Sequence, residues 1–312
     1  MTAELAVTGA LGGLGANVVA EAARRGIAVR ALTRREAALP EGATAMRGDA
    51  LAVGDLVRLT DGAAALVHAV NVSFSADWER SVTGLLDTAI EACRRTGARL
   101  VYPGNVWVFG RGLPGKRYDE REPHAPSSSK GRTRAANEAT LRGSGVSYSV
   151  VRLPEFYGPH VTTLTGPPLR NIAQGKTARW FGDPELEIEL VYMPDAARLL
   201  VDVATDASAA NEVFHLPGAG AITPHAFFSE AIRQSGGRGK LQALPTWVVR
   251  AAGVLSPSAR GFADILHLWE DPILLDGGKA RARFDLRPTP YSEGLERTLA
   301  WLRENPDVKM HY

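Results

Sequence analysis

Short apolar segments recur along the first 160 residues, and each is bounded by glycine or by polar residues. Such segments predict buried strands, and they lie at 5–7, 27–33, 44–50, 65–70, 99–102 and 147–159, the last including its exit. Residues 78–96 place apolar side chains at spacings of three and four, which predicts a long helix with one face in the core. Strands that alternate with helices predict an α/β fold with a doubly wound parallel sheet.

The pattern is less regular after residue 160. An apolar segment at 212–216 predicts a strand that returns to the sheet. Helices are expected at 224–231, 247–255, 259–269 and 292–304, and loops at 166–168 and 256–258. This half is therefore expected to be the smaller and mostly helical part of the chain.

A glycine-rich turn separates the first strand from the first helix. It reads Thr-Gly-x-x-Gly-x-x-Gly, with glycines at 9, 12 and 15. Gly9 permits a tight turn, Gly12 allows the backbone to approach a diphosphate, and Gly15 allows the helix to pack on its strand. The start of the helix then offers N–H groups to an anion. The predicted dinucleotide contacts are Thr8, Gly9, Leu11, Gly12, Gly13, Leu14 and Gly15. The alternative is an ordinary glycine-rich helix entry.

The end of the second strand carries Thr33, Arg34 and Arg35, beginning eighteen residues after Gly15, and no acid. An acidic residue there would bind the 2′-hydroxyl of NAD, whereas arginine favours the 2′-phosphate of NADP. We therefore expect NADP, with NAD the less favoured cofactor. The alternative is that both arginines are solvated surface residues.

Composition narrows the class of protein. The chain has 36 basic and 34 acidic residues with no charged tract, so neither nucleic acid nor a membrane surface is an expected partner. Cys93 is the single cysteine and falls on a predicted core face, and the histidines show no metal-binding spacing, so no metal is expected. The first strand begins at about residue 4 and no apolar stretch reaches about 18 residues, so a cytoplasmic protein is expected.

Two further stretches carry a resemblance to a known family. Glu120, Pro123, Pro126 and Glu138 stand in the register Glu-x-x-Pro-x-x-Pro-x-x-x-Tyr-x-x-x-Lys-x-x-x-Glu, and the stretch 152–159 is similar to Arg-x-x-x-x-Tyr-Gly-Pro. With the glycine turn, these resemble the extended or atypical short-chain dehydrogenase/reductases of the NAD-dependent epimerase/dehydratase type. The resemblance implies a Rossmann-type NAD(P)-binding domain at 1–160, rejoined by about 190–216, and a substrate-binding part at 161–312.

The resemblance also implies cofactor contacts beyond the glycine turn. These are Asp49, Ala50, His68, Ala69, Val70, Pro103, Gly104, Arg134, Leu153, Pro154 and Phe156. Asp49 would lie near the adenine, although capping of a turn explains it equally well. His68 belongs to a buried strand and is expected to be structural rather than catalytic.

Three positions depart from the family pattern. Asn105 stands where the active-site serine is expected, Lys130 where the tyrosine is expected, and Arg134 where the lysine is expected. An ammonium transfers a proton near neutral pH only where burial or a neighbouring cation lowers its pKa, and Arg134, one helical turn on, would supply that cation. The same helix is similar to that of isoflavone reductase-like and phenylpropanoid reductases, in which a lysine takes the catalytic place. The alternative is a solvent-facing basic helix start.

Glu155 is a fourth candidate, at a position where the family commonly has Asn. A half-buried carboxyl group would have a raised pKa and could act as acid or base. The alternative is a salt bridge to Arg152 or Arg170.

Three functions remain open. The first is an NADP-dependent oxidoreductase acting on a small carbonyl or conjugated substrate, with Lys130 donating the proton and Asn105 orienting the oxygen. The second is a nucleotide-sugar epimerase or dehydratase, and the third a non-catalytic NADP-binding sensor. The partner is expected to be a small molecule. A homodimer through helices 78–96 and 131–142 and a monomer are equally compatible with the sequence.

Overall fold

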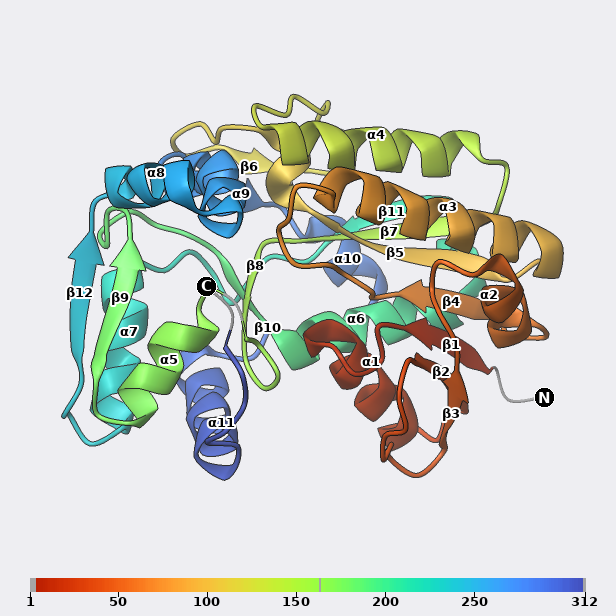
Figure 1. Ribbon diagram of the computed structural model, residues 1–312, viewed down its shortest axis with the longest axis horizontal. Helices are drawn as coiled ribbons and strands as arrows, with labels where there is room; N and C mark the ends of the chain where they lie inside the picture. Colours follow the sequence, from red (N-terminus) through yellow and green to blue (C-terminus); the bar gives the residue numbers. More distant parts are fainter. Residues whose placement is uncertain (1–3, 163, 311–312) are drawn as a thin grey trace.

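A seven-stranded parallel sheet forms the centre of the computed structural model, which describes residues 4–162 and 164–310 (Figure 1). The strand order is β11-β7-β5-β4-β1-β2-β3, and every neighbouring pair is parallel. The strands are β1 (Leu5–Thr8), β2 (Val29–Thr33), β3 (Ala43–Arg47), β4 (Ala65–His68), β5 (Arg99–Asn105), β7 (Tyr148–Leu153) and β11 (Glu212–His215). The predicted doubly wound sheet is confirmed, including the return of 212–216.

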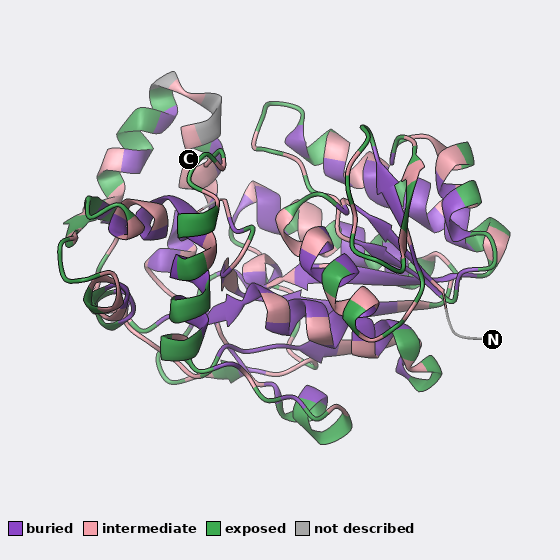
Figure 2. Ribbon diagram, turned by 90° about the horizontal axis from the view of Figure 1, so that it is seen from below, coloured by how far each residue is buried: buried purple, intermediate pink, exposed green. Residues whose placement is uncertain are grey.

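Each face of the sheet packs on its own layer of helices, because successive side chains of a strand point to opposite faces. Leu5 and Val7 pack with α1 (Gly13–Arg24) and α6 (Met193–Thr205), whereas Ala6 packs with the other layer. That layer comprises α2 (Val53–Thr60), α3 (Trp78–Thr96) and α4 (Ser129–Gly143). Figure 2 shows the strands as an almost continuously buried layer between them. A sheet buried on both faces needs apolar strands, which is the pattern the sequence has.

The C-terminal half contains more strand than predicted. It holds α5 (Gly166–Ala173), α7 (Pro224–Gln234), α8 (Thr246–Leu255), α9 (Pro257–Ile265) and α11 (Tyr291–Glu304). Two parallel strand pairs were missed: β9 (Thr177–Phe181) with β12 (Lys240–Leu244), and β8 (Glu155–Tyr157) with β10 (Leu190–Tyr192). The loops expected at 166–168 and 256–258 are also wrong, because α5 begins at Gly166 and α9 at Pro257. Proline is tolerated there because the first N–H groups of a helix lack intrahelical partners.

The remaining elements are short. They are η1 (Val106–Phe109), η2 (Ala207–Ala209), η3 (Leu266–Trp269), α10 (Gly278–Arg283) and the paired β6 (Arg117–Tyr118) and β13 (Leu274–Leu275). Figure 1 shows α8 and α9 beside the N-terminus of α4. The C-terminal half therefore meets the sheet at the carboxyl ends of its strands, where open α/β sheets bind ligands.

Candidate active site

The glycine turn after β1 is shaped by close backbone approach. Gly9 has φ +66°, and a Cβ there would lie 2.6 Å from the Ala69 carbonyl oxygen. A Cβ at Gly15 would lie 2.2 Å from the Gly9 carbonyl oxygen. Both positions therefore require glycine for packing. A Cβ at Gly12 would meet only the Gly9 carbonyl oxygen, at 3.2 Å, so Gly12 is the least crowded of the three glycines, and it is exposed.

The N-terminus of α1 has the features of an anion site. Its N-cap is Gly12, which makes no side-chain cap, and no acidic residue lies in the first turn. The Asn17 amide donates to the Gly13 and Pro159 carbonyls at 2.8 and 3.2 Å, so the turn at 158–160 braces this helix end. Uncapped N–H groups beside a bare glycine fit a dinucleotide diphosphate. Leu11 is partly exposed, whereas Leu14 packs against the core.

Free guanidinium groups gather at the end of β2. Thr33 is buried, while Arg34 and Arg35 are exposed. Within residues 4–162 and 164–310 neither arginine has an ion-pair or hydrogen-bond partner, and the same is true of Arg47, which pairs in register with Thr33 on β3. The Asp49 carboxylate accepts from the Leu51 N–H at 3.0 Å, as a turn-capping residue does, and Ala50 is buried.

The β4 end packs directly beneath the glycine turn. His68 is buried, its Nδ1 lies 3.1 Å from the Thr8 hydroxyl, and burial, together with the charge of Arg134, lowers its pKa to about 4. His68 is therefore a neutral structural residue that ties β4 to β1. Ala69 and Val70 follow it, and their backbone atoms are those that approach Gly9.

Lys130 lies in an aromatic enclosure. Its ammonium is 5.0 Å from the centre of the Phe74 ring and 5.3 Å from that of Trp78, and its side chain is only 10% exposed. The nearest carboxylate oxygen in the described chain is Oδ2 of Asp264, at 3.9 Å. We call Phe74, Trp78 and Asp264 the Lys130 cage. The solvent-facing alternative for Lys130 is thus wrong.

Arg134 also contacts Trp78, and it contacts Trp107 as well. Its guanidinium donates to the Tyr102 hydroxyl at 3.0 Å and to the Asn71 amide oxygen at 3.2 Å. It lies 5.2 Å from the Trp78 ring centre and 5.8 Å from that of Trp107. Trp78 therefore lies against both cations, Lys130 and Arg134. Arginine over an indole face is a favourable arrangement.

Asn105 ends β5 and lies close to Trp107 in the chain and in space. The Asn105 side-chain oxygen accepts from the Trp107 N–H at 3.1 Å and caps η1, which leaves its NH2 group as the one able to bind another group. Pro103 is half-buried. Gly104 is buried, and a Cβ there would lie 3.0 Å from the Glu138 carboxylate, so packing explains that glycine.

Glu155 follows β7 and begins β8. Burial raises its pKa to about 7, against the effect of a hydrogen bond from the Phe156 N–H. The salt-bridge alternatives are wrong, because Arg152 pairs with Glu138 and Arg170 donates to the Val308 carbonyl. Glu155 is thus a carboxyl group close to half-ionised at neutral pH. Leu153 and Pro154 beside it are buried, and Phe156 packs on the core.

The sequence did not reveal the Lys130 cage. Phe74 precedes α3 and Trp78 begins it, with the rest of that helix and β5 between them and Lys130, and Asp264 lies in the other half of the chain. No spacing rule relates these positions. Trp107, which follows β5 and packs against both Phe74 and Trp78, is a local signal, since a large ring after a strand end indicates a lined site.

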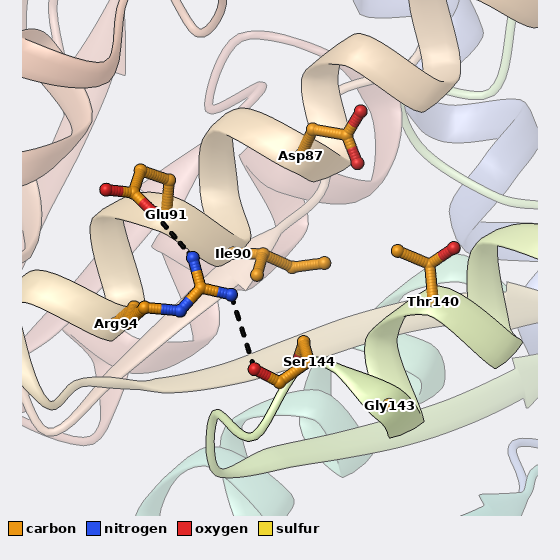
Figure 3. A pocket seen from close by; sticks show the side chains of 7 residues that line it. All are labelled: Asp87, Ile90, Glu91, Arg94, Thr140, Gly143 and Ser144. Carbon is orange, nitrogen blue, oxygen red and sulfur yellow. Dashed lines mark hydrogen bonds and ion pairs between the residues drawn. The ribbon is translucent and has the colours of Figure 1, made fainter.

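An open groove of about 470 Å³ lies between α3 and α4 (Figure 3). Asp87, Glu91, Arg94 and Thr140 are among the residues that line it, together with Ile90. Thr140 is ten residues along α4 from Lys130, which corresponds to roughly 15 Å. The groove is therefore not part of the candidate active site.

The described residues offer neither a metal site nor a membrane-spanning helix. No group of three or more His, Cys, Asp or Glu side chains in that part of the chain could hold a metal ion. Among the helices that the structure describes, none combines the length and apolar character needed to span a membrane.

Comparisons with known proteins agree with the fold. The curated relatives include dTDP-4-dehydrorhamnose reductase of Mycobacterium tuberculosis, 28% identical over 229 residues, which cover 70% of this chain and 71% of the relative. Similar solved structures include UDP-glucose 4-epimerase of Thermotoga maritima with UDP-glucose (TM-score 0.80, 18% identity, 97% of this chain and 100% of that chain). Another is dTDP-glucose 4,6-dehydratase of Bacillus anthracis in complex with NAD (TM-score 0.79, 16% identity, 99% of each chain). The family model for the NAD dependent epimerase/dehydratase family matches residues 5–216, and the chain belongs to that family.

Proposed function

We propose that this chain is an NADP-dependent oxidoreductase that acts on a small carbonyl or conjugated substrate, with Lys130 in the place of the usual tyrosine. The observation that carries the proposal is the Lys130 cage. An amine held against Phe74 and Trp78, of which Trp78 also contacts Arg134, supports the role of a proton donor. A surface lysine at a helix start would have neither the burial nor the aromatic neighbours.

The cofactor would be held by the groups at the strand ends. The N–H groups of the α1 terminus, beside Gly12, would bind the diphosphate, and Arg34 and Arg35 the 2′-phosphate. Arg134, fixed by Tyr102 and Asn71, would bind ribose hydroxyls. A nicotinamide bound in this family supplies or accepts the hydride, which no side chain can do.

Proton handling falls to the protein. Lys130 would give a proton to the substrate oxygen, the Asn105 NH2 group would orient that oxygen, and the Phe74 and Trp78 rings would exclude water. Glu155, with its pKa near 7, can hold or release a proton at the pH of the reaction. The 28% identical relative, named as a reductase, supports the direction of reduction.

A nucleotide-sugar substrate is the second candidate. It is favoured by that same relative, a dTDP-4-dehydrorhamnose reductase, and by the fold shared with UDP-glucose 4-epimerase. A reductase consumes NADPH with either kind of substrate, whereas a nucleotide-sugar epimerase or dehydratase retains its cofactor without a net change of absorbance. Absorbance therefore separates the two reactions, and the choice of carbonyl compound or nucleotide sugar separates the two substrates. The non-catalytic sensor would bind NADP and turn over no substrate.

The decisive experiment follows NADPH absorbance over a panel of carbonyl compounds and nucleotide sugars, with Lys130→Ala beside the wild type. We expect turnover to fall about a hundredfold or more, the usual contribution of general acid catalysis. Lys116→Ala is the matched control, because Lys116 pairs with Glu122 outside the cage and its loss should leave turnover unchanged. Unchanged turnover in Lys130→Ala would remove Lys130 from the mechanism.

We also propose that the chain does not dimerise through α3 and α4. The exposed large apolar side chains of the described chain are Leu11, Leu51, Leu113, Trp247 and Val254, and none lies on either helix. Stable interfaces between identical chains need an apolar centre. Light scattering with size-exclusion chromatography tests this, and a dimer disrupted by substitutions on α4 would contradict it. The cytoplasmic location stays a prediction.

A further inference from the structure

We propose that Asp264, on α9 of the C-terminal half, is a positioning residue of the active site. Its carboxylate seats the first turn of α4 and keeps the Lys130 side chain within the Lys130 cage. The inference rests on the proposed function in one respect, because that function makes Lys130 the proton donor.

The first argument is the charge at the start of α4. The first turn of this helix contains no acidic residue, while Lys130, Arg132 and Arg134 all lie in its first two turns. Cations at a helix N-terminus oppose the helix dipole, so a carboxylate is expected to compensate them. Asp264 does so from another element. Its oxygens accept from the Ser129 N–H at 3.3 Å, the Ser129 hydroxyl at 2.9 Å and the Lys130 N–H at 3.0 Å.

The second argument is that α4 does not depend on Asp264 for its cap. Ser128 is the N-cap, and its hydroxyl oxygen accepts from the Gly131 N–H at 3.0 Å. Asp264 goes further than a cap because its Oδ2 also lies 3.9 Å from the Lys130 ammonium. Burial would raise the pKa of Asp264, but the hydrogen bonds from Lys130 and Ser129 and the nearby ammonium hold it below its usual value. The carboxylate is thus ionised where it meets the ammonium.

The third argument is the contact between α9 and Phe74. A Cβ at Gly261 would lie 2.6 Å from Phe74 Cβ, so α9 approaches the cage as closely as a glycine permits. Gly261 and Asp264 are three residues apart and therefore share one face of α9. That face supports both the aromatic wall and the amine. Seating of α9, which belongs to the half expected to select the substrate, is thereby coupled to the orientation of Lys130.

The test compares Asp264→Asn with the wild-type protein. The amide oxygen of Asn can take the place of Oδ2 and accept from the Lys130 N–H and the Ser129 hydroxyl, so only the longer bond from the Ser129 N–H, at 3.3 Å, is lost. The Ser128 cap remains, so the variant should fold with a small loss of stability, whereas the charge beside Lys130 is removed. Lys130 acylation by limiting N-hydroxysuccinimidyl acetate, read by mass spectrometry, reports release from the cage. We expect its rate, relative to that of Lys176, to rise about threefold or more as α9 opens more often. We expect kcat to fall about tenfold while NADPH affinity stays the same.

Two further variants keep the inference falsifiable. Gly261→Ala pushes on Phe74 without changing any charge and should raise Lys130 acylation in the same way. Asp285→Asn removes an exposed carboxylate that pairs with Arg287 and should change neither readout. Wild-type acylation and kcat in Asp264→Asn would mean that Asp264 is a helix cap alone and would overturn the inference. If no substrate is turned over even by the wild type, the proposed function fails, while the acylation rates still decide the role of Asp264.

Discussion

Arg152 and Glu138 form an ion pair that is closed off from solvent, with Nη2 and Oε2 2.7 Å apart. The pair joins β7 to α4, the helix that carries Lys130 and Arg134. His124 and His215 complete it, with their Nε2 atoms 2.7 and 3.1 Å from the guanidinium. Burial alone would raise the pKa of Glu138, but hydrogen bonds from His124 and Arg152 hold it at about 2.

Removing either partner should destabilise the protein strongly. In Arg152→Met the buried Glu138 carboxylate would lose its shortest ion pair and keep only Arg142 and His124, at 3.3 and 3.4 Å, so the free energy of unfolding should fall by about 3 kcal/mol or more. Urea unfolding at neutral pH measures the change. The double variant Arg152→Met/Glu138→Leu should lose less than either single variant, and Arg94→Met, which breaks an exposed pair with Glu91, should lose at most about 1 kcal/mol. Equal losses at the buried and exposed pairs would contradict this account.

Cofactor choice should depend on Arg34 and Arg35. In the variant Arg34→Ser/Arg35→Ser the Kd for NADPH should rise about tenfold or more, which is about 1.4 kcal/mol, while the Kd for NADH should stay within a factor of about two. Quenching of tryptophan fluorescence measures both. Arg238→Ser removes an exposed cation in the C-terminal half and is the control for net charge. An equal weakening of both cofactors would show that these arginines do not read the 2′-phosphate.

Substitution of Gly12 should weaken cofactor binding, whereas substitution of Gly15 should weaken the fold. Gly12 has φ −83°, which any residue can adopt, and its Cβ would meet only one atom, so Gly12→Ala should cost less than about 1 kcal/mol of stability. The added methyl group would stand at the open α1 terminus, so NADPH affinity should fall about tenfold or more. Gly15→Ala places its Cβ against backbone and should destabilise the fold by about 1–3 kcal/mol or more. Unchanged NADPH affinity in Gly12→Ala would contradict the assignment of the α1 N-terminus as the diphosphate site.

The free energy of unfolding should depend on pH through the ionisation of Glu155. Its pKa is raised in the folded state from 4.5 to about 7, so its contribution is fully present below about pH 4.5 and is lost as the pH rises through 7. Relative to Glu155→Gln, the wild type should therefore lose up to about 3 kcal/mol of unfolding free energy as the pH rises across that window. Urea unfolding at several pH values measures it. The same difference at about pH 5 and about pH 8 would refute the raised pKa.

Local patterns predicted the sheet layer well. The helix at 78–96 was placed with both ends correct, because its apolar spacing is regular and Gly97 ends it in the left-handed conformation, with φ 77°. The glycine turn could also be predicted, since glycine is needed at 9 and 15, where backbone atoms lie close by in the fold. Such features depend on neighbours in sequence or on a strand–turn–helix unit.

The unpredicted features depend on distant partners. Lys130 is a buried cation only because Phe74, Trp78 and Asp264 meet it, and nothing around residue 130 in the sequence encodes them. β9 and β12 pair with each other across more than fifty intervening residues, and only two of their ten residues are buried, so neither shows a strong apolar signal. The start of α5 was missed because Gly166, Pro167 and Pro168 indicate a break in most contexts.

The position of β11 limits how the molecule can be divided. Residues 212–215 form the outermost strand beside β7, and α6 covers α1, although both belong to the sequence after residue 160. A polypeptide ending at 160 would leave the β7 hydrogen-bonding edge bare and the α1 face uncovered, conditions that promote aggregation. The first half can therefore not be obtained by cutting the gene at that point, and any chimaera that exchanges the C-terminal half must keep 190–216 with the first half.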